Sequence, residues 1–314
     1  MATAVVLGLA AAAGVAVYRG VGPLPDAEGC TAVVAGHRVE LGTEQSENAA
    51  LIAGLGIRRG LPPRAVSIAL ATAMQESKLL NLEHGDRDSL GLFQQRPSQG
   101  WGTQAQILNP AHAINAFYDA LVEVDGYESM EITVAAQAVQ RSAYPEAYAQ
   151  HEADARALAS ALTGETPGGS FSCVVRSADP ADSARLNRVG LTRRADDLRR
   201  EVLAVFGDVP LGGFEPGGAE DGHMAGSAHY EGRAVDLFVR PVSAPNRQRG
   251  WAIAAYLVAQ AGRLGIEHVI FDDRIWTSGS SSEEGWRDYR VPSGSTGDQA
   301  VLEHRDHVHV DVAR

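Results

Sequence analysis

The sequence predicts two domains, an all-α domain followed by an α+β domain. The 314 residues exceed the usual size of one domain. Apolar residues recur at helical spacing over residues 42–164, whereas residues 234–239 and 307–312 alternate as β-strands do. A turn-rich run at residues 163–170 predicts the break between the two parts. The predicted boundaries are a first domain at residues 51–164 and a second at 181–314, with linkers at 23–50 and 165–180.

The first 22 residues predict export. Residues 2–18 form one apolar run interrupted only by Thr3, and this run is short beside the roughly 20 residues of a membrane-spanning helix. A signal peptide usually begins with positive charge, but here the first charged residue is Arg19, after the run. A signal peptide and an uncleaved membrane anchor both stay open. Either one predicts an extracytoplasmic protein, secreted or membrane-anchored.

The charge balance narrows the class of partner. The chain carries 39 acidic and 27 basic residues, which give a net charge of −12, and no block of Lys and Arg. Nucleic-acid-binding proteins show a clustered positive surface, so this balance argues against nucleic acid as a partner.

The chain has two cysteines, Cys30 and Cys173. In an exported protein an even pair predicts a disulfide, which here would tie together the two ends of the first domain. Two separate buried thiols are the alternative. Neither cysteine has a neighbouring metal ligand in the sequence, which argues against a cysteine zinc site.

Several helices are predicted in the first domain. The second of them starts at the pair Pro62 and Pro63, carries an apolar face of small residues, and has Glu76 near its end. A loop rich in Gly and Asp follows at residues 84–89, and then the segment at residues 90–97. The other predicted helices cover residues 49–59, 110–124, 133–140 and 145–163.

The pair Glu-Ser at residues 76–77, then the Gly/Asp-rich loop, then G-L-F-Q-Q at residues 91–95 resembles the lysozyme-like lytic transglycosylases and resuscitation-factor domains. The resemblance implies a lysozyme-like fold and makes Glu76 the acid that protonates the glycosidic oxygen, with a pKa raised by desolvation. It makes Gln94 and Gln95 candidate glycan contacts.

Two departures from this family pattern bear on activity. Many lytic transglycosylases carry an Ala-Tyr-Asn segment in a late helix, but residues 135–144 contain no Asn. No second carboxylate is obviously placed for catalysis, although Asp86 and Asp88 lie in the right loop. A domain that binds glycan without cutting it is therefore the alternative.

The second domain is predicted to mix helices and strands. A helix and a glycine-rich loop lead to the first alternating strand, and an amphipathic helix and a hairpin around Asp272 and Asp273 follow. Trp276 and Trp286 are expected either to line a cleft or to pack in the core. The predicted helices cover residues 195–206 and 246–265, the strands 234–239, 267–271, 274–277 and 307–312, and the loops 211–218, 278–284 and 294–298.

Two separated motifs supply ligands for a metal ion. Residues 227–236 contain His229 and Asp236, and residues 306–309 read Asp-His-Val-His. Side chains alternate along a strand, so His307 and His309 share one face. Two adjacent strands could then bring His229, Asp236 and His309 onto one zinc ion, whose catalytic sites use three protein ligands of this kind.

The pattern S-x-H-x-x-G-x-A-x-D, followed later by D-H-x-H, resembles the zinc peptidases that cut peptidoglycan peptides. These are the D-alanyl-D-alanine carboxypeptidase and L-alanyl-D-glutamate endopeptidase group, which shares its metal-site fold with the Hedgehog signalling domain. Over residues 181–314 the resemblance implies Zn²⁺ on the three ligands, Asp306 as general base and an active-site role for His307. Many members have Glu and an aromatic residue at these last two positions.

Further side chains are candidate substrate contacts. Arg233 or Arg274 could help stabilise an oxyanion, and His304 could contact substrate or support the site. His223, in the loop before the first motif, is a candidate substrate contact and a weaker candidate ligand. Together these features predict a peptidoglycan hydrolase with a zinc peptidase domain and a glycan domain. The alternatives are a non-catalytic wall-binding scaffold and an enzyme in which only one domain cuts.

Overall fold

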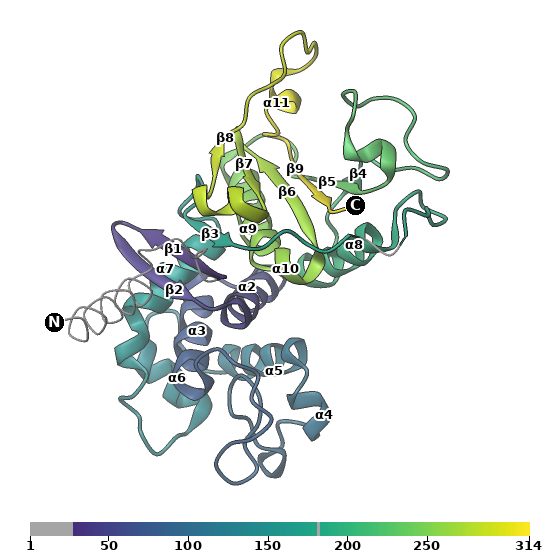
Figure 1. Ribbon diagram of the computed structural model, residues 1–314. Coiled ribbons are helices and arrows are strands. Elements are labelled where there is room, and N and C mark those ends of the chain that lie inside the picture. The colour runs from purple at the N-terminus through teal and green to yellow at the C-terminus, as the bar shows by residue number, and fades with distance from the viewer. Residues whose placement is uncertain (1–27, 181–182) are drawn as a thin grey trace, which may run out of the picture.

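The computed structural model describes residues 28–180 and 183–314. Two antiparallel sheets, each accompanied by helices, make up these parts of the chain (Figure 1). The predicted export segment at residues 1–22 lies outside the described residues. Among the helices of the described ranges, none is long and apolar enough to cross a membrane.

The first half contains a three-stranded sheet that the all-α prediction did not include. Strands β1 (Gly29–Val34) and β2 (His37–Leu41) form a hairpin, and β3 (Phe171–Val174) pairs with the other edge of β1. The hairpin turns at Ala35 and Gly36, which both have positive φ, as tight hairpin turns require. The predicted linkers 23–50 and 165–180 are therefore corrected, because both contribute strands to this sheet.

Six α-helices accompany this sheet, and α3 lies at their centre. Prolines at its start suit the first turn of a helix, and its small and apolar residues are buried against α2, α5, α6 and α7. The last helix begins later than predicted, because residues 145–151 form a turn and a short 3-10 helix instead. The α-helices are α2 (Thr43–Arg58), α3 (Pro63–Ser77), α4 (Gln104–Ile107), α5 (Pro110–Val122), α6 (Ile132–Gln140) and α7 (Glu152–Leu162), and the 3-10 helices are Pro97–Gln99 and Ala149–His151.

The second half is built on a six-stranded sheet with the order β4-β5-β9-β6-β7-β8, antiparallel throughout. Helix α9 packs against β6 and β9, and α8 contacts β5 and β9. The strands are β4 (Leu211–Gly212), β5 (Ala234–Phe238), β6 (Ile266–Phe271), β7 (Arg274–Thr277), β8 (Arg287–Asp288) and β9 (His307–Val312). The helices are α8 (Arg193–Phe206), α9 (Ala244–Ala259), α10 (Ala261–Leu264) and α11 (Gln299–Leu302), with 3-10 helices η3 (Ala228–Glu231) and η4 (Gly279–Glu284).

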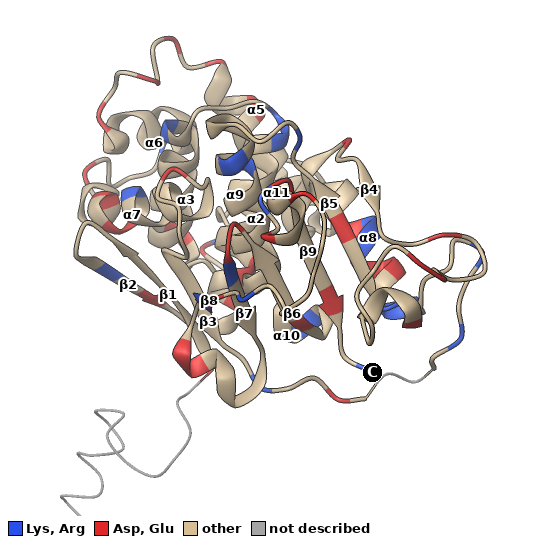
Figure 2. Ribbon diagram, turned by 90° about the horizontal axis from the view of Figure 1, so that it is seen from above, with Lys and Arg blue, Asp and Glu red and all other residues tan. Residues whose placement is uncertain are grey.

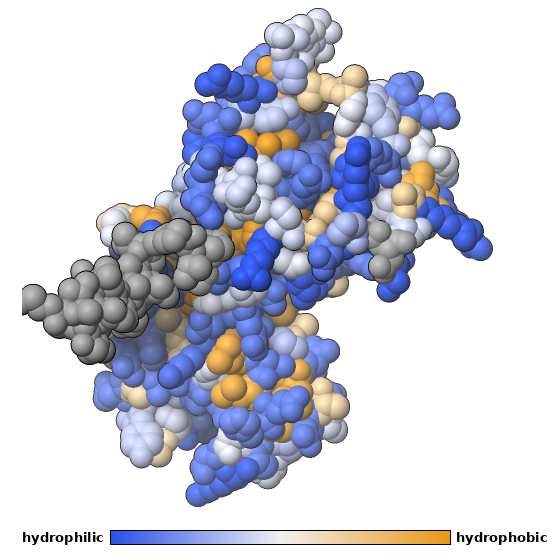
Figure 3. Space-filling view, in the orientation of Figure 1, coloured by the Kyte–Doolittle hydropathy of each residue, from blue (hydrophilic) through white to orange (hydrophobic). Residues whose placement is uncertain are grey.

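The two halves share one hydrophobic core. Helix α2 of the first half packs against α8 and α9 of the second, and the buried apolar residues form one cluster that runs from Cys30 to Val312. Gly54 permits this packing, because a Cβ placed there would lie 2.4 Å from a methyl carbon of Val205. Most of the surface seen in Figure 3 is hydrophilic, and Figure 2 shows acidic and basic residues intermixed along the helices and loops.

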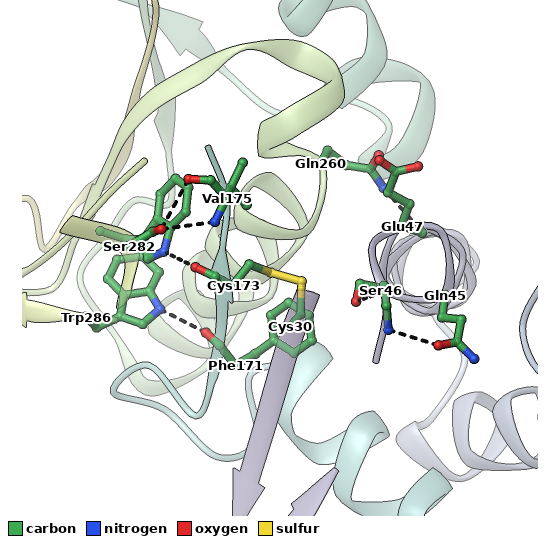
Figure 4. Close-up of a disulfide and its surroundings, with 12 residues drawn as sticks. Cys30, Gln45, Ser46, Glu47, Phe171, Cys173, Val175, Gln260, Ser282 and Trp286 are labelled. Atoms are coloured by element: carbon green, nitrogen blue, oxygen red, sulfur yellow. Dashed lines mark hydrogen bonds between the residues drawn. A yellow bond between two sulfur atoms is a disulfide. The ribbon is translucent and has the colours of Figure 1, made fainter. Parts of the chain in front are cut away.

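Strand β3 joins the halves a second time. The predicted disulfide between Cys30 and Cys173 is present, and it links facing residues of β1 and β3 (Figure 4). On the other side of β3, the indole N–H groups of Trp276 and Trp286 donate to the carbonyls of Cys173 (3.1 Å) and Phe171 (2.9 Å). Both tryptophans are buried, so they pack in the core and do not wall a cleft.

Candidate metal centre

The three predicted metal ligands meet on one face of the six-stranded sheet. Asp236 on β5 lies directly opposite His309 on β9, and His229 comes from η3, just before β5. Alternation along β9 places His307, His309 and Asp311 on this same face. The strand register therefore brings together side chains that are far apart in the sequence.

The ligand atoms form a nearly equilateral triangle. His229 Nε2 lies 3.1 Å from His309 Nδ1, and Asp236 Oδ1 lies 3.1 Å from His309 Nδ1 and 3.2 Å from His229 Nε2. A tetrahedral zinc ion with bonds of about 2.0–2.1 Å separates its ligand atoms by about 3.3 Å. All three side chains are buried. Two imidazoles and a carboxylate at this spacing fit zinc in both chemistry and geometry.

The backbone fixes which nitrogen of His229 faces the triangle. The Ser227 hydroxyl caps the short η3 turn by accepting from the His229 N–H at 3.4 Å. The His229 Nδ1 donates to the Gly213 carbonyl at 2.6 Å, which leaves the Nε2 lone pair for the site. Gly213 has φ +78°, and a Cβ there would lie 2.2 Å from His229 Cε1. Only glycine therefore fits this close approach.

Asp236 and His309 stabilise each other's charged forms. Burial alone would raise the pKa of Asp236, but its close contacts with the His229 and His309 rings outweigh burial and hold that pKa well below its usual range. Burial would lower the pKa of His309, but hydrogen bonds to Asp236 and Asp311 raise it to about 9. A bound cation would take the place of a proton on His309.

His307, the predicted active-site histidine, is held by the predicted base. His307 Nδ1 donates to Asp306 Oδ1 at 2.7 Å, and the Arg240 Nε donates to Asp306 Oδ2 at 2.6 Å. Burial would raise the pKa of Asp306, but these two hydrogen bonds lower it below its usual value. The His307 Nε2 faces the ligand triangle, 3.7 Å from Asp236 Oδ1.

Arg240 was missed by the sequence reasoning. Its guanidinium lies 4.0 Å from the centre of the Phe238 ring at the end of β5, in addition to its bond to Asp306. Its position shortly after Asp236 was the only signal in the sequence. Nothing in that spacing indicates the partner, because Asp306 belongs to a segment that only the sheet brings near.

Two further histidines flank the triangle. His223 stacks on His229 with ring centres 3.8 Å apart, and His223, His229 and Asp236 each offer a ligand atom within 4.8 Å of one another. His304 lies on the other side, with its ring centre 4.8 Å from that of His307. Burial and the neighbouring histidines lower the pKa of His304 to about 3, so its ring is neutral.

A cavity of about 580 Å³ opens over these residues. Arg233 also lines it, but its guanidinium bonds Glu231 at 2.6 Å, Glu267 at 3.3 Å and the Val312 carbonyl. These bonds hold the Arg233 side chain in the wall of the cavity. Arg274 is engaged elsewhere, with Asp288 and the Trp286 carbonyl near β8, so it is not the oxyanion group that the sequence suggested. The polar side chains that line the cavity include His223, His229, Arg233, Asp236, Arg240, Glu267, His268, His304, His307, His309 and Asp311.

In the first half, Glu76 stands near the end of α3 and is half-buried. Its Oε1 accepts a hydrogen bond of 2.7 Å from the hydroxyl of Tyr148, a buried residue that the sequence reasoning missed. Gln94 has a positive φ of 46°, is half-buried, and donates to the Gly91 carbonyl at 3.2 Å.

The structure corrects the expectation for Gln95. This side chain is only 2% exposed and donates to the Ala113 carbonyl at 3.1 Å, so it supports the loop from inside and is closed to glycan. Asp88 is also committed to its loop, since it accepts from Ser98 and Arg96. These hydrogen bonds hold the pKa of Asp88 well below its usual range.

Comparison with known proteins touches only the second half. A family model described as VldE, C-terminal domain, matches residues 187–300, somewhat more than a third of the chain. The matched segment contains His229 and Asp236 and ends before His309. No curated protein matches the chain. The match is consistent with a peptidase-like C-terminal domain.

Proposed function

We propose that the protein is a peptidoglycan hydrolase outside the cytoplasm, secreted or anchored, whose C-terminal half is a zinc-dependent peptidase acting on stem or cross-link peptides. The observation that carries this proposal is the triangle of His229, Asp236 and His309, with edges of 3.1–3.2 Å beside a cavity of about 580 Å³. A zinc ion held there would supply a Lewis acid and lower the pKa of water to about 7.

The chain's own residues would handle the proton. His307 Nε2 faces the triangle and takes the proton of the attacking water, then returns it to the leaving amine. Asp306 accepts from His307 Nδ1, orients the ring and stabilises its charged form, and Arg240 holds Asp306 in place. This refines the predicted roles, because both oxygens of Asp306 already have partners and it acts through His307.

We also propose that the first half has a lysozyme-like fold and binds or cuts glycan strands. Glu76 is the proposed acid and Gln94 the proposed glycan contact, supported by the fact that both side chains are only partly buried. A non-catalytic wall-binding scaffold and an enzyme with one active half are the rival functions.

Metal analysis and digestion of purified peptidoglycan test the peptidase. We expect close to one zinc per chain and release of new amino groups. A His309→Ala variant should lose both, whereas His37→Ala, which removes an exposed imidazole on β2, should lose neither. A wild-type protein with neither zinc nor released amino groups would favour the scaffold.

A second comparison separates the halves. A Glu76→Gln variant should keep peptide cleavage and lose glycan cleavage, with the fragments identified by mass. Unchanged glycan products would show that Glu76 is not the acid. Absence of glycan products from the wild type would leave the first half as a glycan-binding part.

A further inference from the structure

His309 presents its two ring nitrogens to two different sets of neighbours. Nδ1 faces Asp236 and His229 in the ligand triangle. Nε2 lies 3.3 Å from Asp311 Oδ2, a buried carboxylate two residues further along the same face of β9. Asp311 is not one of the three proposed metal ligands, yet it contacts the ring nitrogen of His309 that faces away from the triangle.

Asp311 is in turn held by His268. The His268 Nδ1 lies 3.0 Å from Asp311 Oδ1 and 3.2 Å from Oδ2. The carboxylate therefore has a partner on each side, His309 toward the triangle and His268 away from it. The result is a continuous hydrogen-bonded chain from the edge of the cavity to a metal ligand.

A β-bulge in β6 makes this chain. Ile266 lies opposite Val312, yet His268 lies opposite Asp311, so β6 advances two residues while β9 advances one. Regular pairing would place His268 opposite Val310, on the face that packs against α9. The bulge at Glu267 instead moves His268 onto the cavity face, and bulges commonly re-aim side chains beside functional sites.

We propose that Asp311 and His268 are positioning residues that fix the tautomer and ring orientation of His309, so that its Nδ1 lone pair is presented to the metal. A neutral imidazole carries one N–H, and the hydrogen bond that it makes decides which nitrogen is free. Asp311 accepts from Nε2–H, so Nδ1 is the nitrogen whose proton a bound cation would replace. This inference rests on the proposed zinc site.

A second metal ion is the competing explanation for the same residues. Glu267, His268 and Asp311 each offer a ligand atom within 4.8 Å of one another. The Arg233 guanidinium, 3.3 Å from Glu267, already supplies positive charge at that position. Asp311 also directs one oxygen toward His309, as a carboxylate that orients a ligand histidine does.

Zinc affinity of the metal-free full chain, measured by competition with a chromogenic chelator, tests the proposal. Asp311→Asn should weaken affinity by about 10–100-fold, the usual effect of removing such a partner. His268→Gln should weaken it less, and Glu267→Gln, which alters the bulge residue but not the chain, should leave it unchanged. Nitrogen NMR of the zinc-loaded protein should find the His309 proton on Nε2, and thermal unfolding of each metal-free variant checks that it folds.

Failure of this inference, a second metal site and failure of the proposed function give different results in these measurements. Wild-type affinity in folded Asp311→Asn, or in His268→Gln if Asp311→Asn does not fold, overturns the inference and leaves the zinc site standing. Two zinc ions per wild-type chain, with one lost in Glu267→Gln, replace the inference with a second metal site. A wild-type chain that binds no zinc overturns the proposed function and this inference together.

Discussion

Three histidines around the cavity use one ring nitrogen inside the protein and keep the other for the site. His229 bonds the Gly213 carbonyl, His307 bonds Asp306, and His309 lies against Asp311. In each case the acceptor decides which nitrogen is available and how the ring is turned. The chemistry of the site therefore depends on residues that would never touch a metal or a substrate.

Replacement of Gly213 tests this dependence. Gly213→Ala would put a Cβ 2.2 Å from His229 Cε1 and 2.9 Å from Asp236 Oδ2, at a φ of +78°. We expect loss of bound zinc and about 1–3 kcal/mol of destabilisation from the strained backbone. Zinc content and urea unfolding measure the two effects.

Gly217→Ala is the matched control for that experiment. Gly217 also has positive φ, +96°, but nothing lies within 4 Å of the added Cβ. It should lose stability and keep zinc. Equal zinc content in the two variants would contradict the proposed contact.

We expect loss of the hydrogen bond between Arg240 and Asp306 to lower kcat without changing zinc affinity. Arg240→Gln leaves Asp306 with His307 alone, and loss of a hydrogen bond to a charged group is worth about 1.5–3 kcal/mol, or roughly 10–100-fold in kcat. Zinc affinity should not change. Arg247→Gln is the control, because Arg247 is 51% exposed against 53% for Arg240 and bonds Asp272 at the same 2.6 Å. A fall in zinc affinity with Arg240→Gln would contradict the assigned role.

At the scale of elements, the strongly periodic segments were predictable, whereas the strands of the first sheet were not. Residues 133–140 and 307–312 gave clear helical and alternating patterns, and the structure has α6 and β9 there. The hairpin β1–β2 was missed because its turn reads Ala-Gly instead of a stronger hairpin pair. β3 is only four residues long, so its pairing depends on β1 and not on its own pattern.

The packing of α8 against α9 and α10 predicts a dependence of stability on pH. Glu201 of α8 accepts from the Tyr256 hydroxyl at 2.6 Å and from Arg263 at 2.8 Å. Burial alone would raise the pKa of Glu201, but these hydrogen bonds lower it below 4.5. The stabilisation is therefore present above about pH 4.5 and is lost as the pH falls through the lowered folded-state pKa.

Glu201→Gln should thus destabilise the protein by about 1–2 kcal/mol at pH 7 and by less in acid. Urea unfolding at both pH values measures the difference. Glu40→Gln provides the control, because the Glu40–Arg38 pair is exposed and should contribute little. A Glu201→Gln effect that does not shrink in acid would contradict this linkage.

At the scale of the whole molecule, the sequence predicted the metal ligands of the candidate site but not the residues that hold those ligands in place. The motifs identified His229, Asp236 and His309 because their residue types and spacing suit zinc. Gly213 and Arg240 were not predicted. The role of Gly213 comes from the close approach of its backbone to His229, and that of Arg240 from the strand register that brings Asp306 near it. Gln95 was misassigned because a motif does not reveal whether a side chain points outward or into the core.

The disulfide closes the longest covalent loop of the described chain. Cys30 and Cys173 are separated by 143 residues, and loop closure of that length corresponds to about 5 kcal/mol at most. Replacing both cysteines by alanine should lower the unfolding free energy by up to this amount and leave the fold intact, because β1 and β3 stay paired. Urea unfolding of the double variant against the oxidised wild type is the measurement, and equal midpoints would contradict the estimate.

The helix pair α2 and α9, packed across the boundary, has a consequence for the proposed action on peptidoglycan. We expect neither half to be soluble as a separate fragment, because separation would expose the apolar surface that each half now buries against the other. For the same reason, we expect no hinge motion between the two halves. Glu76 and the histidine cavity are therefore held at a fixed separation, and under the proposed function a peptidoglycan segment would have to match that separation to reach both at once.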